Sequence, residues 1–436
     1  MRNSPLLIAL AFSLAPSVYA QRLVSVVQSP KTSGSVAPTA PTIDVLDGRS
    51  FVLGMKPGGD LALTAKLLGA ELVETIPGPS PFGLVTLNRG AAAASGLIVG
   101  LPSIDFFEPV RRLGAPLTPG CTGTNSAAAP LSGSGCIAFF DGDPTPAEYF
   151  NQSALAAIDV SSLHPQLIGN LSIVAVIDTG IDASHPSLIG RVLPNGFDFV
   201  DRDLFPAEMS DGLDNDGDGL IDEAFGHGTH ISGTIALLNP DARILPLRVL
   251  DSEGNGTSFA VAEAIYYAIG SGADVINLSL GMNGDSKIVR QAIRAALEAE
   301  IVVLAAAGNS GSQIVQFPAR IDDVVAVTAV DEFDAKAAFA SYGYAVELAA
   351  PGVRIYSAMP GGQYAWWSGT SMATSVASGA VSLLHSLSGN PFETEGDELL
   401  ENTTFSIESS NPGIYSLLGG GRIDPVAASL LLFSQS

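Results

Sequence analysis

The sequence predicts an α/β fold with a mostly parallel central sheet, preceded by a small α+β unit. Short β-branched runs that are apolar on both faces alternate with helical stretches, a pattern typical of a parallel sheet covered on both sides. The chain has 436 residues, 47% hydrophobic and 15% charged, so it can bury a large core. The predicted strands are 173–177, 244–249, 275–280, 301–306 and 324–330, and the predicted helices between them are 229–238, 258–269 and 286–299.

The first twenty residues have the pattern of a secretory signal peptide. Arg2 supplies a positive start, 6–15 form an apolar core, and small or tolerated residues precede Gln21. This apolar core is shorter than the roughly 20 residues that a membrane anchor needs. We therefore expect an exported protein, extracellular or periplasmic, that is not held in a membrane.

The charge balance is strongly acidic, with 20 basic and 44 acidic residues and a net charge of -24. Nucleic acid and anionic membranes are therefore poor partners, because their phosphates repel such a surface. We expect a monomer that acts without an organic cofactor.

The region before the parallel sheet divides into a lead-in, a folded unit and a connector. Residues 21–105 contain an unpatterned stretch and then a small α+β unit at about 49–102, with strands near 51–54, 71–74 and 82–87 and a helix at 60–69. The connector, 106–150, is rich in Gly, Pro, Ser and Ala and contains Cys121 and Cys136. An even cysteine count in an exported chain favours a disulfide over two free thiols. A zinc site is not expected, because the sequence has no second pair of ligands beside these cysteines. The third unit, 151–436, contains the predicted sheet.

Ser371 begins an apolar, Ala-rich run that predicts a buried helix. A hydroxyl there lies beside free backbone N–H groups at the positive end of the helix dipole, which suits a nucleophile whose attack creates an oxyanion. An ordinary Ser N-cap is the alternative from this stretch alone.

Other polar residues follow predicted strands or open predicted helices. Asp178 directly follows the strand 173–177 and is a candidate to orient a histidine; Asp182, in the following turn, is the competing acid. His227 opens an apolar helix and is the candidate base, whereas His230 fits a packed helical histidine. Asn309 ends a buried strand, where its amide can donate to an oxyanion or simply form a turn.

The order Asp178, His227, Ser371, within Asp-Thr-Gly, His-Gly-Thr-His and Gly-Thr-Ser-Met-Ala, resembles the subtilisin-like serine proteases. The resemblance implies a subtilisin-like three-layer fold, preceded by a propeptide that assists folding and blocks the site until it is cut away. It implies that Ser371 attacks a peptide carbonyl, His227 transfers the proton and Asp178 orients the imidazole. Asn309 and the Ser371 N–H would then bind the oxyanion.

The same resemblance implies two extended edges that pair with the backbone of protein or peptide substrates. Their residues are Gly254, Gly256, Ser279, Leu280 and Gly281. The sequence departs from the family pattern after Thr374, where Ser375-Val376 replaces the usual proline and the bulky residue after it. We expect this change to affect the packing of the Ser371 helix and to leave the three catalytic residues in place.

An acidic loop between Asp178 and His227 resembles the first part of an EF-hand calcium loop. The candidate Ca²⁺ ligands are Asp214, Asp216, Asp218 and Asp222. The twelfth position is Phe225 rather than Glu, so the full motif is absent. The alternative is a solvated acidic turn, but closely spaced carboxylates repel one another without a cation.

Three functions are compatible with parts of this pattern. The first is a secreted serine endopeptidase made as a zymogen, and the second is a catalytically inactive relative that acts as a binding protein. An esterase or lipase is the third. Those enzymes carry a Gly-x-Ser-x-Gly motif, and their acid and base come after the serine in the chain. Here Ala373 replaces the second glycine and the acid and base come first, which favours the protease.

Overall fold

The computed structural model describes residues 49–78, 80–88, 98, 101–115, 146–167, 169–217, 219–282, 284–388 and 396–435. The predicted signal peptide, Cys121, Cys136 and Asp218 lie outside these residues. Within the described part of the chain, no helix is both long and apolar enough to cross a membrane.

A seven-stranded parallel sheet forms the centre of the molecule, as the sequence predicts. Its strand order is β13-β12-β11-β10-β6-β8-β7. Five of its strands match the predicted runs closely; the short edge strands β7 and β13 were not predicted. The strands are β6 (Ser172–Asp178), β7 (Phe197–Asp198), β8 (Ala242–Arg248), β10 (Val275–Leu278), β11 (Val302–Ala306), β12 (Val325–Val330) and β13 (Leu348–Pro351).

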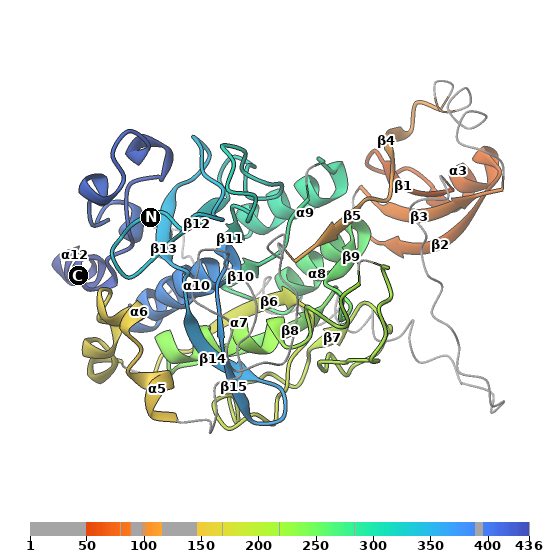
Figure 1. Cartoon of the computed structure of the whole chain (residues 1–436). Helices are drawn as coiled ribbons and strands as arrows, with labels where there is room; N and C mark the ends of the chain where they lie inside the picture. The colour runs from red at the N-terminus through yellow and green to blue at the C-terminus, as the bar shows by residue number, and fades with distance from the viewer. Residues whose placement is uncertain are drawn as a thin grey trace, which may run out of the picture.

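Helices cover both faces of this sheet, because alternate residues of each buried strand point to opposite sides. On β6, Val174 and Val176 pack in one core cluster with α7 (His227–Leu238) and α10 (Thr370–Leu387). Ala175 and Ile177 pack in the other cluster with α8 (Ser258–Gly270) and α9 (Lys287–Glu298). Figure 1 shows the resulting three layers, with α10 beside the sheet and α8 and α9 on the other side.

The strand order reverses at β6, and this reversal positions the site. The chain passes from β6 to β8 on one side and then returns to place β10 on the other side of β6. In parallel α/β sheets, ligands bind beyond the carboxyl ends of the strands at such a switch point. Asp178 ends β6, and Ser279 follows β10 at the same edge.

The N-terminal unit is a four-stranded antiparallel sheet with one helix. The strand order is β2-β3-β1-β4, and α3 covers one face. Asp60 caps α3 by accepting a hydrogen bond from the Leu63 N–H, and Gly69 ends it in the left-handed conformation. The elements are β1 (Ser50–Met55), α3 (Leu61–Leu68), β2 (Ala70–Ile76), β3 (Phe82–Leu87) and β4 (Ile104–Pro109).

β4 extends this unit beyond the predicted end near 102 and into the predicted connector. Ile104, Phe106 and Glu108 are buried and alternate with more exposed residues, as in a half-buried strand. This short strand was not predicted because a Pro/Ser-rich sequence precedes it and a long low-complexity sequence follows it.

The other face of the N-terminal sheet packs on α8 and α9 (Figure 1). Glu108, 9% exposed, accepts hydrogen bonds from the N–H groups of Lys287 (2.9 Å) and Ile288 (3.1 Å) at the start of α9. Arg202 forms ion pairs with Glu74 of the N-terminal sheet and, at 2.9 Å, with the buried Glu263 of α8. The unit therefore docks through a helix cap and a shared arginine as well as through apolar contacts.

Several smaller elements complete the fold and, apart from β9 at the predicted extended edge, were not predicted from the sequence. β14 and β15 form an antiparallel hairpin that leads directly into α10. The remaining elements are β5 (Arg112–Gly114), α5 (Pro146–Phe150), α6 (Ser153–Ala156), η3 (Val160–Ser162), η4 (His164–Gln166), β9 (Asn255–Thr257), β14 (Ile355–Met359), β15 (Gln363–Trp367), α11 (Gly396–Glu401), η6 (Glu408–Ser410), η7 (Tyr415–Leu417) and α12 (Pro425–Gln435).

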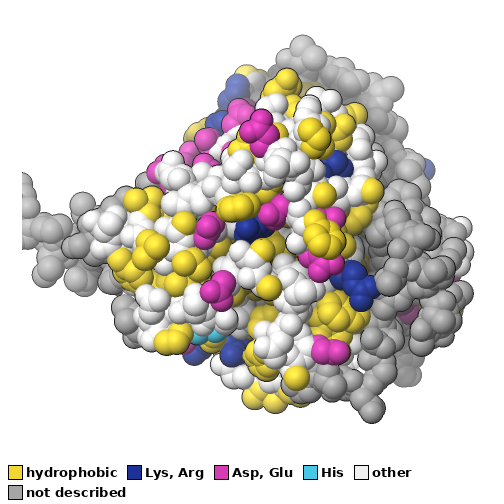
Figure 2. Space-filling model, turned by 60° about the vertical axis from the view of Figure 1, so that its left-hand side comes forward, with side chains coloured by type: hydrophobic (Ala, Val, Ile, Leu, Met, Phe, Trp, Pro, Cys, Tyr) yellow, Lys and Arg dark blue, Asp and Glu magenta, His cyan; other side chains and the backbone are white. Residues whose placement is uncertain are grey.

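The surface agrees with the acidic composition. On the face shown in Figure 2, Asp and Glu side chains are scattered among uncharged and apolar ones, and the visible Lys and Arg side chains are few and apart. This described face therefore offers no broad basic surface of the kind that binds a phosphate backbone.

Candidate active site

A buried pair, Asp178 and His227, forms the centre of the site. Asp178 is the last residue of β6 and His227 the first of α7. The His227 Nδ1 lies 2.7 Å from Asp178 Oδ1, and the two side chains are 2% and 0% exposed. The Thr179 N–H donates to the same carboxylate oxygen at 2.8 Å. A carboxylate that accepts the Nδ1–H fixes the imidazole tautomer and leaves Nε2 to accept a proton.

The His-Gly-Thr-His sequence lets α7 start directly against the Asp-Thr-Gly turn. A Cβ built at Gly228 would lie 2.2 Å from the carbonyl oxygen of Gly180, so this close approach requires glycine. The Gly228 N–H also donates to Thr179 Oγ1 at 2.9 Å. His227 and Asp178 are thus held together by backbone packing as well as by their own hydrogen bond.

Glu208 is a second carboxylate at the start of α7, and the sequence analysis did not identify it. It accepts hydrogen bonds from the N–H groups of Gly226 (3.1 Å) and Thr229 (3.0 Å) and from Thr179 Oγ1 (3.1 Å). Burial is the largest influence on its pKa and raises it, while these hydrogen bonds act in the opposite direction. Glu208 satisfies N–H groups that a first helical turn leaves unpaired, which holds the segment around His227 in place.

Ser371 is the second residue of α10, which is buried along its whole length. The Ser371 side chain is 2% exposed, and its hydroxyl donates to the Ser279 carbonyl at 3.4 Å. In return, the Ser279 hydroxyl donates to the Ser371 carbonyl at 3.2 Å. This exchange fixes the start of α10 over the carboxyl end of β10, the neighbour of β6 in the sheet.

Asn309 follows β11 and faces the start of α10. Its Oδ1 accepts hydrogen bonds from the Thr370 N–H and the Thr370 hydroxyl, both at 2.9 Å. A Cβ built at Gly369 would lie 3.2 Å from Asn309 Nδ2 and 3.7 Å from the Ser371 backbone nitrogen. The Asn309 side-chain nitrogen and the Ser371 backbone nitrogen therefore lie close to the same point beside Gly369.

The departure at Ser375 leaves α10 intact. The Ser375 hydroxyl is buried and donates to the Met372 carbonyl at 2.7 Å, so it adds no unpaired polar group to the core. Val376 is fully buried, and the helix runs without a break from Thr370 to Leu387. Packing of this helix does not depend on the proline that the family pattern favours.

His230 lies one turn after His227 and is fully buried. Burial lowers its pKa to about 3, and its Nε2 lies 3.1 Å from the Ile355 carbonyl and 3.2 Å from that of Ala365. His230 is therefore a neutral histidine that ties α7 to the β14–β15 hairpin. Trp367 packs edge-on against both histidines, with ring centroids 5.3 Å from His227 and 5.6 Å from His230.

β5, from the segment after the N-terminal sheet, lies between the two predicted substrate-binding edges. It pairs antiparallel with β9, where Leu113 lies opposite Gly256. Gly114 exchanges two hydrogen bonds with Gly281, at 3.0 and 2.8 Å, and the Ala115 N–H donates to the Gly254 carbonyl at 3.0 Å. Of the remaining predicted binding residues, Ser279 contacts Ser371 and Leu280 is fully buried.

The acidic loop arranges its carboxylates differently from the predicted ligand set. Asp214 accepts hydrogen bonds from the N–H groups of Gly217 and Gly219, and Asp222 accepts one from the Gly212 N–H at 2.8 Å. Among the described residues, one oxygen each of Asp216, Glu223 and Glu253 lie within 4.8 Å of one another. A group of three carboxylates at this spacing is suitable for a divalent cation.

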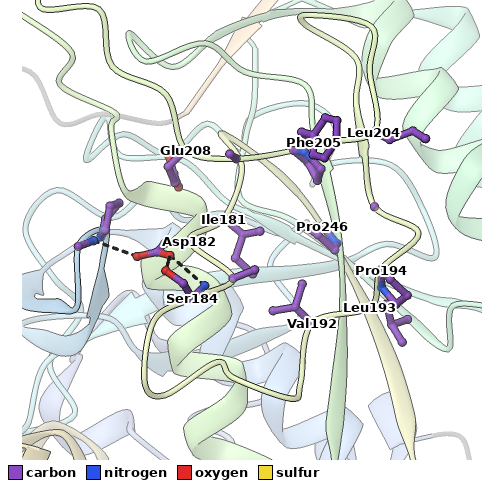
Figure 3. Close-up of a pocket in the computed structure, with 16 residues that line it drawn as sticks. Ile181, Asp182, Ser184, Val192, Leu193, Pro194, Leu204, Phe205, Glu208 and Pro246 are labelled. Atoms are coloured by element: carbon purple, nitrogen blue, oxygen red, sulfur yellow. Dashed lines mark hydrogen bonds between the residues drawn. The ribbon is translucent and has the colours of Figure 1, made fainter. Parts of the chain in front are cut away.

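A pocket of about 550 Å³ is lined in part by Glu208. Figure 3 shows Ile181, Val192 and Phe205 around it, with Asp182 accepting hydrogen bonds from Ser184 and from the Gly361 N–H. None of the four predicted catalytic residues lines this pocket. Asp182 therefore stabilises a turn, whereas Asp178 contacts His227.

A family model described as "Subtilase family" matches residues 169–419. The chain belongs to the subtilase family. Its relatives include the thermophilic serine proteinase of Bacillus sp. (strain AK1), 41% identical over 256 residues, which are 56% of this chain and 59% of that protein. Thermitase of Thermoactinomyces vulgaris is 42% identical over 223 residues, 49% of this chain and 74% of that protein.

A solved structure agrees in fold with this subtilase. The crystal structure of fervidolysin from Fervidobacterium pennivorans, a keratinolytic enzyme related to subtilisin, matches with a TM-score of 0.68 and 25% sequence identity. The match covers 88% of this chain and 61% of the fervidolysin chain. The resemblance drawn from the motifs is thus confirmed at the level of fold and family, and the family is one of serine endopeptidases.

Proposed function

We propose that this subtilase is a secreted serine endopeptidase, made as a zymogen, whose triad is Asp178, His227 and Ser371. The buried 2.7 Å contact between His227 Nδ1 and Asp178 Oδ1 is the observation that carries the proposal. His227 Nε2 takes the proton from the Ser371 hydroxyl as that oxygen attacks the peptide carbonyl, and later gives it to the leaving amine. Asp178 holds the imidazole in the required tautomer and stabilises the imidazolium.

The oxyanion of the tetrahedral intermediate binds to Asn309 Nδ2 and the Ser371 backbone N–H. Support comes from the closeness of both nitrogens to the same point beside Gly369. Thr370 holds the amide oxygen of Asn309 with two hydrogen bonds, so the amide is oriented before substrate arrives. Such preorganised donors are worth more in a buried site than in water.

The substrates are proteins or peptides bound in an extended conformation. Gly254, Gly256 and Gly281 offer backbone groups at two facing edges, and β5 already pairs with these edges as an added strand. Binding through the backbone accepts many side chains, so broad specificity is expected.

The N-terminal unit, predicted within 21–105 and ending with β4 at Pro109, acts as a propeptide, and the part of the connector 106–150 after β4 contains the cut that releases the catalytic unit 151–436. The position of β5 supports this role, because a segment that fills both edges would exclude a substrate. We also propose that 1–20 are a signal peptide that exports the chain, and that Cys121 and Cys136 form a disulfide.

A structural calcium ion in the acidic loop of Asp214, Asp216, Asp218 and Asp222 completes the proposal. The close spacing of these carboxylates in the sequence before His227 supports it, since a cation would remove their repulsion and stabilise the entry to α7.

Fluorophosphonate labelling of the purified full chain beside a Ser371→Ala variant tests the activity, with mass spectrometry of both chains. We expect label only on the wild-type protein, and loss of the N-terminal region only there. An unlabelled wild-type chain that stays unlabelled after limited trypsin treatment with calcium would instead identify a catalytically inactive binding protein.

A further inference from the structure

Glu208 contacts both segments that carry the Asp178–His227 pair. One of its carboxylate oxygens, Oε1, accepts hydrogen bonds from the Thr229 N–H (3.0 Å) and hydroxyl (3.2 Å) and from the Thr179 hydroxyl (3.1 Å). Its other oxygen, Oε2, accepts the N–H group that directly precedes His227 in the chain, at 3.1 Å. Thr179 directly follows Asp178, so one carboxylate joins the turn after the acid to the start of α7.

The donors around Glu208 fit its ionised form. The two N–H groups can only donate. Thr179 Oγ1 already accepts the Gly228 N–H and Thr229 Oγ1 accepts the Asp182 N–H, both at 2.9 Å, so each hydroxyl has its own proton to donate. Burial raises the pKa of Glu208, and the hydrogen bonds donated to the carboxylate oppose that rise. A negative charge is therefore held beside the first turn of α7.

The Thr179 hydroxyl has a second acceptor within reach, Asp178 Oδ1 at 3.3 Å. That oxygen already accepts the Thr179 N–H at 2.8 Å and lies 2.7 Å from His227 Nδ1. Glu208 Oε1 is the closer acceptor, so the single hydroxyl proton is directed toward Glu208. A polar chain from Glu208 through Thr179 and Asp178 to His227 thus connects a second carboxylate to the imidazole.

We propose that Glu208 is a positioning residue of the reaction, which fixes the Asp178 turn against α7 and whose negative charge stabilises the imidazolium of His227. The inference rests on the proposed function for the role of His227 as the base. An imidazolium forms only as the Ser371 hydroxyl attacks and loses its proton. A charge that favours the imidazolium therefore acts in the transition state, and its effect belongs in kcat rather than in KM.

Backbone contacts hold Glu208 where this charge is needed. The Ile181 N–H donates to the Pro206 carbonyl at 2.9 Å, and Ile181 forms an isolated parallel bridge with Ala207. A Cβ built at Gly180 would lie 2.8 Å from the Ala207 carbonyl oxygen, so this close approach requires glycine. The Asp-Thr-Gly turn therefore positions the segment that leads to Glu208 as well as its own aspartate.

Asp178, Asp182 and His227 are the titratable groups that face Glu208 among the described residues. Asp178 interacts with Glu208 through space and adds to the rise of its pKa. Asp182 lies near Glu208 on the wall of the same pocket (Figure 3), but its oxygens accept hydrogen bonds within its own turn and from the Gly361 N–H. Asp182 thus has the same charge and a similar place with different contacts, which makes it a matched control.

The test compares two variants of Glu208 with Asp182→Asn in steady-state kinetics on a peptide substrate, across the acid limb of kcat/KM. Glu208→Gln removes the charge and keeps the size, whereas Glu208→Asp keeps the charge on a shorter side chain. We expect Glu208→Gln to lower kcat at least about tenfold, with KM within about threefold, and to move the acid limb about 0.5 pH unit lower. Glu208→Asp should lower kcat and keep the acid limb, and Asp182→Asn should change neither.

Wild-type kcat in Glu208→Gln would overturn the proposal. A lower kcat with an unmoved acid limb would also overturn it, because a purely structural helix cap predicts that result. An equal shift of the limb in Asp182→Asn would assign the effect to overall charge. Should Glu208→Gln show no cooperative unfolding transition, Glu208→Asp decides: full kcat there would reject the positioning role, and a loss of kcat with the acid limb in place would support it.

A second measurement does not depend on activity and separates this inference from the proposed function. The imidazole of His227 is titrated by NMR in the full chain with Ser371→Ala, and its signal is identified by its absence from a His227→Ala chain. We expect Glu208→Gln to lower the titration midpoint by about 0.5 pH unit and Asp182→Asn to leave it in place.

The two results together distinguish the two failures. If fluorophosphonate did not label the wild-type chain, the proposed function would fail, whereas the His227 midpoint would still move in Glu208→Gln. A labelled wild-type chain with the same midpoint in Glu208→Gln would retain the proposed function and lose this inference.

Discussion

The catalytic edge of the sheet and the acidic loop both gather carboxylates beside His227, but they hold them differently. Asp178 ends a buried strand and is fully enclosed, with the Thr179 N–H and His227 as donors. In the loop, Asp214 is exposed and Asp222 is half-buried, and both accept N–H groups of their own turns. The first site is built by long-range strand and helix packing, and the second mainly by local turns.

This difference sets the size of the effect expected from a change in each region. A group in the enclosed site cannot be replaced by water, so its loss leaves partners unpaired or in the wrong protonation state. A carboxylate in the exposed loop can be solvated when its partner leaves. Substitutions at the catalytic edge should therefore remove activity, and changes in the loop should mainly alter stability and ordering.

Asp178→Asn should have the largest effect. The amide cannot accept the Nδ1–H as a carboxylate does, so His227 loses the correct tautomer and the stabilisation of its charge. We expect kcat to fall about 10⁴-fold, the loss known for the equivalent change in another serine protease, with folding retained. Steady-state kinetics on a peptide substrate measure it. Asp182→Asn is the matched control, and an equal loss there would break the distinction between the two acids.

Asn309→Ala should have the next largest effect, because it removes one of two oxyanion donors. We expect kcat to fall about 10²–10³-fold, the loss that subtilisin itself shows when its side-chain donor is removed, with KM nearly unchanged. Ser310→Ala, at the exposed neighbouring position, should retain activity within a few fold. A rise in KM without loss of kcat would mean that Asn309 binds ground-state substrate instead.

The motifs predicted the sheet and its helices, and they indicated candidate catalytic residues where a strand ends or a helix begins. Asp178 follows a continuous apolar run, and Ser371 opens another, so periodicity alone indicates their positions. Glu208 and Glu253 were missed because no neighbouring residues form a recognisable motif with them. Glu208 accepts an N–H group at the start of α7, and Glu253 accepts the N–H group of Asp222 in the distant acidic loop. β4 and the β14–β15 hairpin were missed because short strands among glycines and prolines have weak periodicity.

His230→Gln tests the enclosed region through pH. The folded pKa of His230 is lowered from 6.5 to about 3 by burial, so the unfolded chain binds this proton more tightly. His230 therefore contributes full stability above pH 6.5 and loses it as pH falls toward 3, by about 3 kcal/mol at pH 4. Gln keeps a donor for the two carbonyls and does not titrate.

The measurement is the unfolding midpoint between pH 7 and pH 4 in the Ser371→Ala background. We expect the midpoint of His230→Gln to fall less over this range than that of the parent. His164→Gln, at a half-buried histidine whose ring nitrogen Nε2 lies 3.0 Å from the Leu238 carbonyl, serves as the control. An unchanged pH dependence in His230→Gln would show that protonation of His230 does not cause the loss of stability at low pH.

Removal of calcium should have the smallest effect, and it tests the loop side of the comparison. An ion that binds only the folded chain stabilises it by about 2.7 kcal/mol when its concentration is a hundred times Kd. At about 2 °C per kcal/mol for a unit of this size, EDTA should lower Tm by about 5 °C. Asp216→Asn should begin near the lower Tm and respond less to EDTA. Loss of fluorophosphonate labelling in EDTA at 25 °C, well below Tm, would contradict the separation of the two regions, because the ion would then be required to form the catalytic edge itself.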